Sequence, residues 1–188
     1  MADFLPPILR DSAMVLRPPQ IEDVAAVTAA CQDAEIDRWT PLPSPYGEEH
    51  ARAWVEAQPE DDRVGLLVVE TETEELLGSV GLEGIGQNRG RAEIGFWTAP
   101  WARRRGVAVR AVRLLTGWAF DTLALARLEA WVREENHLSQ RVLERAGFTR
   151  EGLLRSYEEI KGERWDIAIF SRLAEEEMSE LRRSSHEA

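Results

Sequence analysis

Cysteine is nearly absent from this chain, which has one thiol, Cys31, among its 188 residues. A single cysteine excludes an intrachain disulfide and a multi-cysteine metal cluster, in keeping with a reducing compartment. The three histidines, His50, His137 and His186, also lack the spacing and the companions of metal ligands. We therefore expect no bound metal.

Long apolar runs are missing as well. No stretch approaches the roughly 18–20 apolar residues that a membrane span requires, and the first residues show no positive charge followed by an apolar segment. Both absences predict a cytoplasmic protein without a membrane partner. The length and the 44% apolar content suit one globular core, so we expect a single domain over residues 1–174 and a polar tail over residues 175–188.

Positive charge is in short supply, because the formal net charge is −11. Nucleic-acid binding depends on a basic surface that displaces counterions from phosphates, so no nucleic-acid partner is expected. A cationic partner fits the overall charge, whereas the arginines between Arg103 and Arg113 would suit an anion. Acidic charge also serves solubility, so the net charge alone does not choose a partner.

The spacing of apolar residues predicts an α/β (α+β) chain in the order strand, two helices, three strands, helix, strand, helix, two strands. Strands are expected at 14–17, 64–70, 75–82, 91–98, 125–132, 152–160 and 164–173, and helices at 20–31, 48–58, 109–120 and 136–146. The segment from Trp39 to Gly47 contains three prolines and is expected to be a loop. Trp39 could line a pocket there or simply pack.

A basic glycine turn joins the strand that ends at Thr98 to the helix that follows. Its sequence is Arg103-Arg104-Arg105-Gly106-Val107-Ala108. The first N–H groups of a helix have no partner inside the helix, and the helix dipole favours an anion at that end. Strand, turn and helix together therefore suit a diphosphate, although a basic turn that only solvates a helix start would look similar.

Three later segments give the chain a family resemblance. They read Asn136-x-x-Ser139, then Val-Leu-x-x-x-Gly-Phe ending at Phe148, then Glu-Gly-x-Leu-Arg beginning at Glu151. With the basic turn, they resemble the GNAT acyltransferases and, more narrowly, the branch that acetylates the N-termini of ribosomal proteins. The resemblance covers about Leu16 to Leu173. It implies a GNAT fold, with a mixed, mostly antiparallel central sheet of about 6–7 strands, flanked by about 4 helices and splayed in the middle for CoA.

The resemblance also assigns residues to the cosubstrate, acetyl-CoA. The strand end at Trp97 and Thr98 would bind the pantetheine arm through its backbone, as an added strand would, in a slot expected between residues 93–98 and 126–132. The diphosphate would lie on the turn formed by Arg103, Arg104, Arg105, Gly106, Val107 and Ala108. Asn136 would contact the arm and Ser139 would lie near the sulfur. Asn136 would equally suit an N-cap, and both roles are compatible.

Acyl transfer to an amine requires a neutral nucleophile and a stabilised leaving thiolate. Glu158 is the first candidate base, because the resembled branch has a glutamate just before its last hairpin turn. Glu93, beside the expected slot, is the second. Simple strand alternation places Tyr157 and Glu159 on the face opposite Glu158. Ser139 is expected to stabilise the thiolate, and each glutamate could instead be an exposed strand carboxylate.

These observations predict direct acetyl transfer from acetyl-CoA to an amine in a ternary complex, with no covalent acyl-enzyme. Deprotonating an α-amino group costs roughly 3.4 kcal/mol less at neutral pH than deprotonating lysine, which favours the N-terminus of a protein or peptide as acceptor. A small cationic metabolite or antibiotic is one alternative. A regulatory module that binds CoA without turnover is another, and a homodimer is left open.

Overall fold

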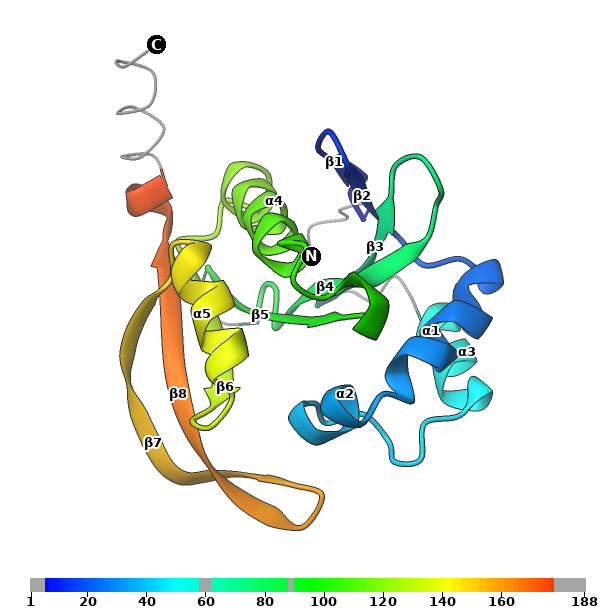
Figure 1. Ribbon diagram of the computed structural model, residues 1–188. Coiled ribbons are helices and arrows are strands. Elements are labelled where there is room, and N and C mark those ends of the chain that lie inside the picture. The colour runs from blue at the N-terminus through cyan, green and yellow to red at the C-terminus, as the bar shows by residue number, and fades with distance from the viewer. Residues whose placement is uncertain (1–5, 58–61, 88–89, 178–188) are drawn as a thin grey trace.

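A computed structural model of the chain describes residues 6–57, 62–87 and 90–177. Eight strands form one sheet in the order β1-β2-β3-β4-β5-β6-β8-β7 (Figure 1). All neighbouring strands run antiparallel except β5 and β6, which run parallel. The strands are β1 (Leu9–Arg10), β2 (Met14–Arg17), β3 (Arg63–Glu70), β4 (Leu76–Glu83), β5 (Arg91–Thr98), β6 (Arg127–Arg133), β7 (Thr149–Ile160) and β8 (Glu163–Leu173). The predicted mixed, mostly antiparallel sheet is confirmed.

Helices cover both faces of this sheet. They are α1 (Val24–Cys31), α2 (Ala34–Trp39), α3 (Glu48–Glu56), α4 (Val107–Asp121) and α5 (His137–Arg145), with short 3-10 helices at Ile21–Asp23 and Pro100–Ala102. In Figure 1, α4 and α5 lie together and α1, α2 and α3 form a separate group. No helix in the described ranges is long and apolar enough to cross a membrane.

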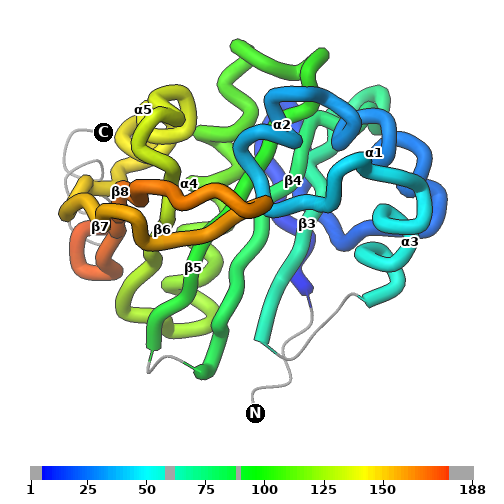
Figure 2. The backbone as a smooth tube through the Cα atoms, turned by 90° about the horizontal axis from the view of Figure 1, so that it is seen from below, coloured from blue at the N-terminus to red at the C-terminus, as the bar shows by residue number. Residues whose placement is uncertain are grey.

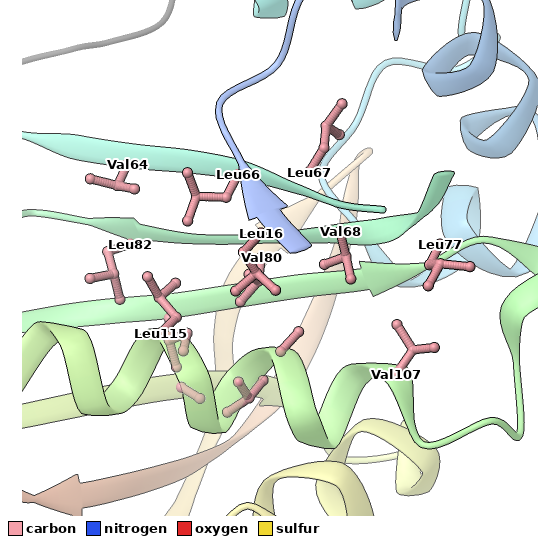
Figure 3. Close-up of a cluster of buried hydrophobic side chains, with 14 of the residues drawn as sticks. Leu16, Val64, Leu66, Leu67, Val68, Leu77, Val80, Leu82, Val107 and Leu115 are labelled. Atoms are coloured by element: carbon pink, nitrogen blue, oxygen red, sulfur yellow. The ribbon is translucent and has the colours of Figure 1, made fainter. Parts of the chain in front are cut away.

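The core lies on both faces of the sheet, under α4 on one face and under α1, α2 and α3 on the other. Leu66 and Val80 point toward Leu115 of α4, whereas Leu67 points away from that helix (Figure 3). Because Leu66 to Val69 are all buried, β3 is apolar on both faces, and its sequence contains a continuous hydrophobic run. The same run made this strand easy to predict.

Besides the 3-10 helix Pro100–Ala102, two elements were not predicted. The two-residue strand β1 extends the sheet beyond β2, and α2 occupies the approach to the proline-rich segment. Asp33 begins α2 by accepting hydrogen bonds from the N–H groups of Glu35 and Ile36 at 3.0 and 3.1 Å. Trp39 is therefore the last residue of a helix rather than part of a loop.

The sheet splays between β5 and β6. Their pairing stops at Glu93 opposite Glu129, while β6 continues beside β8 as far as Arg133. The slot therefore lies between the second halves of the two strands, and Glu93 stands at its closed end. The predicted slot began at residue 126 of the second strand, but residues 127–129 are paired.

The β7–β8 hairpin carries a bulge in its outer half. Residues 155–157 bulge out opposite Asp166, and Ser156 adopts a positive φ of 50° while its N–H donates to Asp166 Oδ1 at 2.7 Å. The tip of the hairpin reaches α2 (Figure 2). Residues 174–177 continue from β8 as a short helix, and the rest of the predicted polar tail lies outside the described residues.

Candidate functional site

The glycine turn before α4 presents unpaired backbone N–H groups. Gly106 adopts the left-handed conformation, with φ 75° and ψ 9°, and Arg104 has φ 62°. The first backbone bond of α4 runs from Arg110 N to Gly106 O at 3.2 Å, so the N–H groups of residues 107–109 have no partner within the helix. A Cβ added at Gly106 would meet open space. The turn is therefore open at Gly106, and its unpaired N–H groups are suited chemically to an anion.

Two of the three arginines of this turn are already paired with carboxylates. Arg103 binds Asp33 through both terminal nitrogens, and Arg105 binds Glu70. Arg104 has no such partner among the described residues. The sequence predicted charge from all three guanidinium groups, but an anion here would depend mainly on backbone N–H groups and on Arg104.

Trp97 and Thr98 lie at the open end of the slot. On one side they pair with Ser79 and Gly78 of β4. On the other side, no strand among the described residues pairs with β5 after Glu93, so alternate backbone groups there face the slot. An extended, amide-containing chain such as the pantetheine arm could pair with them.

Asn136 begins α5, as the N-cap alternative predicted. Its Oδ1 accepts the N–H of Ser139 at 3.1 Å, and the side chain is buried. The Asn136 amide nitrogen makes no hydrogen bond within the described part of the chain, so it stays available as a donor. The cap fixes Ser139 in the first turn of the helix.

Glu93 faces away from α4, because its neighbours Ala92 and Ile94 are buried on the α4 face. The side chain reaches solvent, but the protein atoms around the carboxylate remove part of its hydration, and this desolvation raises the pKa of Glu93 to about 7. The negative charges of Glu83, Glu158 and Glu129 raise the pKa further. Glu83 and Glu129 are its partners on the two neighbouring strands.

Glu158 and Tyr157 both lie on this acidic face. Glu158 is near enough for its charge to act on Glu93 and on Arg133. The ring of Tyr157 packs edge-on against Trp131, with centroids 5.2 Å apart. The prediction that Tyr157 faces the opposite side from Glu158 is wrong, because the bulge at residues 155–157 breaks the alternation of β7.

Sequence reasoning missed a cation beside these groups. Arg133 is buried, and its guanidinium stacks on the ring of Trp165 at 3.4 Å from the centroid. Its Nη1 donates to the carbonyl of Arg38 at 2.7 Å. Burial lowers the pKa of Arg133, although the charges of Glu163 and Glu158 oppose that effect. No local pattern marked this arginine, because its partners come from distant segments.

Trp39 does not point freely into a pocket. Its Nε1 donates to Glu35 at 2.9 Å, and the guanidinium of Arg38 lies 4.5 Å from its ring centre. These contacts support the packing alternative.

Comparisons with known proteins agree with this geometry. The family model described as an acetyltransferase (GNAT) domain matches residues 13–149. The chain is 30% identical over 169 residues to YoaA, an uncharacterized N-acetyltransferase of Bacillus subtilis (strain 168), which covers 88% of this chain and 96% of that protein.

A shorter match of 34% over 101 residues, covering 54% of this chain and 55% of the relative, is to YdaF of the same organism, named a putative ribosomal N-acetyltransferase. Among solved structures, a GNAT-family acetyltransferase from Bacillus anthracis has the same fold, with a TM-score of 0.82, 23% identity, and coverage of 90% of this chain and 99% of that one.

Proposed function

Because the chain belongs to the GNAT N-acetyltransferases, for which acetyl-CoA is the typical cosubstrate, we propose that it acetylates the α-amino group of a protein or peptide by direct attack in a ternary complex. The observation that carries this proposal is the slot itself: β5 loses its partner strand after Glu93 and leads to the open turn before α4, and Glu93, whose pKa is raised to about 7, stands at the closed end. A base of that pKa suits an α-ammonium group, whose ordinary pKa is about 7.7–8.0, far better than lysine at about 10.4.

Glu93 is the base we propose, ahead of Glu158. The sequence ranked Glu158 first, but Glu158 lies on the β7–β8 hairpin, whereas Glu93 stands on β5 where the slot begins, and the negative charge of Glu158 supports the proton affinity of Glu93. Glu93 takes a proton from the acceptor ammonium at a carboxylate oxygen, and solvent can then receive it because the side chain is exposed. Glu158 and Glu83 attract the cationic acceptor.

The cosubstrate would be held by the groups on the other side of the slot. When bound, acetyl-CoA supplies the thioester that donates the acetyl group. The turn from Arg103 to Ala108 holds the diphosphate, and the open backbone edge at Trp97 and Thr98 orients the arm. Asn136 contributes its amide, and the Ser139 hydroxyl donates a hydrogen bond where the thiolate departs.

Support for a protein acceptor also comes from YdaF, which is named a putative ribosomal N-acetyltransferase. A small cationic amine, such as a polyamine or an aminoglycoside, is the second candidate. The specific observation in its favour is the set of unpaired carboxylates around the slot, Glu83, Glu93 and Glu158, which none of the ion pairs within the described ranges neutralises.

An acceptor panel tests the proposal. Purified protein would be mixed with acetyl-CoA and with peptides bearing a free N-terminus, the same peptides with a blocked N-terminus and an internal lysine, polyamines and aminoglycosides. Thiol release would be followed, and mass spectrometry would locate the acetyl group. We expect acetylation of free N-termini and not of blocked peptides. Turnover with polyamines alone would favour the second candidate, and no thiol release with any acceptor would contradict both.

Glu93→Gln separates catalysis from binding. We expect it to lower kcat by about 10²–10⁴ while CoA still raises the Tm as in the wild type. Glu72→Gln, on the exposed turn between β3 and β4, is the matched control and should leave kcat unchanged. Full activity of Glu93→Gln would contradict the proposed base.

A further inference from the structure

An ion pair links the proposed diphosphate turn to helix α2. Arg103 Nη1 lies 3.3 Å from Asp33 Oδ2, and Arg103 Nη2 also binds Asp33 Oδ1. The same carboxylate begins α2 through the N–H groups of Glu35 and Ile36. Burial tends to raise the pKa of Asp33, but the hydrogen bonds from Arg103 and from the backbone lower it on balance. The carboxylate is therefore charged and held from both sides.

The other end of α2 is tied to the β7–β8 hairpin. Lys161, at the hairpin tip, donates from Nζ to the carbonyl and the carboxylate of Asp37 at 2.6 and 2.7 Å. Figure 2 shows the tip lying against α2. Arg38 provides a second tie, because its carbonyl accepts the hydrogen bond from Arg133 Nη1.

Both contacts connect α2 to the outer half of the β7–β8 hairpin, which carries Glu158 and Trp165 and which we call the acceptor wall. Arg133 stacks on Trp165, and Trp165 is the cross-strand partner of Glu158. Between its two ends α2 is short, about 9 Å at 1.5 Å per residue, and Ile36 anchors it in the core. A displacement at one end of so short a helix is passed to the other.

We propose that Asp33 is a positioning residue that couples the binding of acetyl-CoA to the order of the acceptor wall. The proposal rests on the proposed function, which puts a diphosphate on the turn. A guanidinium has five N–H donors, of which Asp33 engages one on each of two nitrogens, so Arg103 keeps donors for a phosphate while it holds Asp33. A diphosphate on the turn thus restrains Arg103, Asp33, α2 and the hairpin tip together.

The consequence is cooperative binding of the two substrates. If acetyl-CoA orders α2 and the hairpin, the acceptor binds to residues that are already ordered. The conformational entropy cost of its binding is then smaller, so it binds more tightly. By linkage, the acceptor strengthens acetyl-CoA binding by the same factor. Such coupling fits an enzyme that requires both substrates together in one complex.

Asp33→Asn isolates the ion pair from the helix cap. Asparagine caps a helix about as well as aspartate, so α2 keeps its start while the charge that holds Arg103 is lost. Asp23→Asn is the matched control, because Asp23 also binds an arginine, Arg17, at 2.7 Å and accepts the N–H of Gln20, yet it touches neither the turn nor α2.

Hydrogen–deuterium exchange with CoA as the probe gives a readout that needs no acceptor. In the full wild-type chain we expect CoA to slow exchange in residues 103–110, in α2 and in residues 158–163. In Asp33→Asn, CoA should still slow exchange in residues 103–110. The factor by which CoA slows exchange in α2 and at the hairpin tip should be at least about fivefold smaller than in the wild type, which is in the range of ordinary coupling factors. Lys161→Met should lose it at the tip and keep it in α2. Asp23→Asn should behave as the wild type.

The outcomes separate the two proposals. If CoA slows exchange nowhere in the wild type, the diphosphate site fails and with it the proposed function. If CoA protects 103–110 alone in the wild type, or if Asp33→Asn protects α2 and the tip as the wild type does, the coupling is overturned. A purely structural role, in which Asp33→Asn speeds exchange of α2 equally with and without CoA, also overturns it.

A kinetic measurement checks the same point with an acceptor from the panel. At saturating acetyl-CoA we expect Asp33→Asn to raise the acceptor KM by about fivefold or more while kcat stays within about twofold. An unchanged KM would count against the coupling even if exchange were altered.

Discussion

The pH dependence of stability in Glu93→Gln tests the electrostatics on which the proposed base depends. The pKa of Glu93 is raised from 4.5 to about 7, first by desolvation and then by the charges of Glu83, Glu158 and Glu129. Folded Glu93 therefore holds its proton more tightly than the unfolded chain does. The free energy of unfolding should fall as the pH rises from about 4.5 through about 7, where folded Glu93 must carry its charge.

The magnitude follows from the same values. A rise from 4.5 to about 7 corresponds to about 3 kcal/mol for a group shielded from water. The Glu93 side chain is exposed, so water and salt screen much of this penalty, and we take about 1 kcal/mol. Glutamine has no charge to bury. The stability of Glu93→Gln relative to the wild type should therefore increase by about 1 kcal/mol between about pH 5 and about pH 8.

Urea unfolding of both proteins at several pH values measures this difference directly. Titrating groups far from Glu93 contribute equally to both proteins and cancel in the comparison, whereas the interactions of Glu93 with Glu83, Glu129 and Glu158 are part of the difference that is measured. The exposed-turn variant Glu72→Gln should show no such trend. A wild-type-to-Glu93→Gln difference constant within about 0.3 kcal/mol across this pH range would refute the raised pKa and remove the reason for choosing Glu93 as the base.

Three further outcomes follow from the structure. Glu83→Gln removes the charge of the cross-strand partner of Glu93, so the rising limb of the kcat/KM profile should move to lower pH by about 0.5–1 unit, and an unmoved limb would exclude this interaction. Gly106→Ala should cost about 1 kcal/mol in urea unfolding through its positive φ, since a Cβ there meets no atom, and CoA affinity should fall with it; equal stability would mean the turn adapts freely. Gly147→Ala should cost more, about 2–4 kcal/mol, because its Cβ would lie 1.7 Å from the buried guanidinium of Arg172, and a cost no larger than that of Gly106→Ala would contradict this contact.

The sequence by itself determined most of the helices and strands and the turn before α4. The apolar runs of β3 and β4 and the glycine at position 106 depend on local rules of burial and backbone conformation, which act over a few residues. The short strand β1 and helix α2 escaped prediction because neither has an apolar pattern of its own. Asp33 could be recognised as a cap only once the helix was seen.

Tertiary structure alone decided the chemistry of the acidic face. The proton affinity of Glu93 depends on Glu83, Glu129 and Glu158, which come from three other strands, and electrostatic energy depends on distance in space rather than along the chain. Arg103 and Asp33 likewise meet across 70 residues. Tyr157 shares a face with Glu158 because the bulge at residues 155–157 interrupts the alternation of side chains between the two faces of β7, and the sequence alone does not show this bulge.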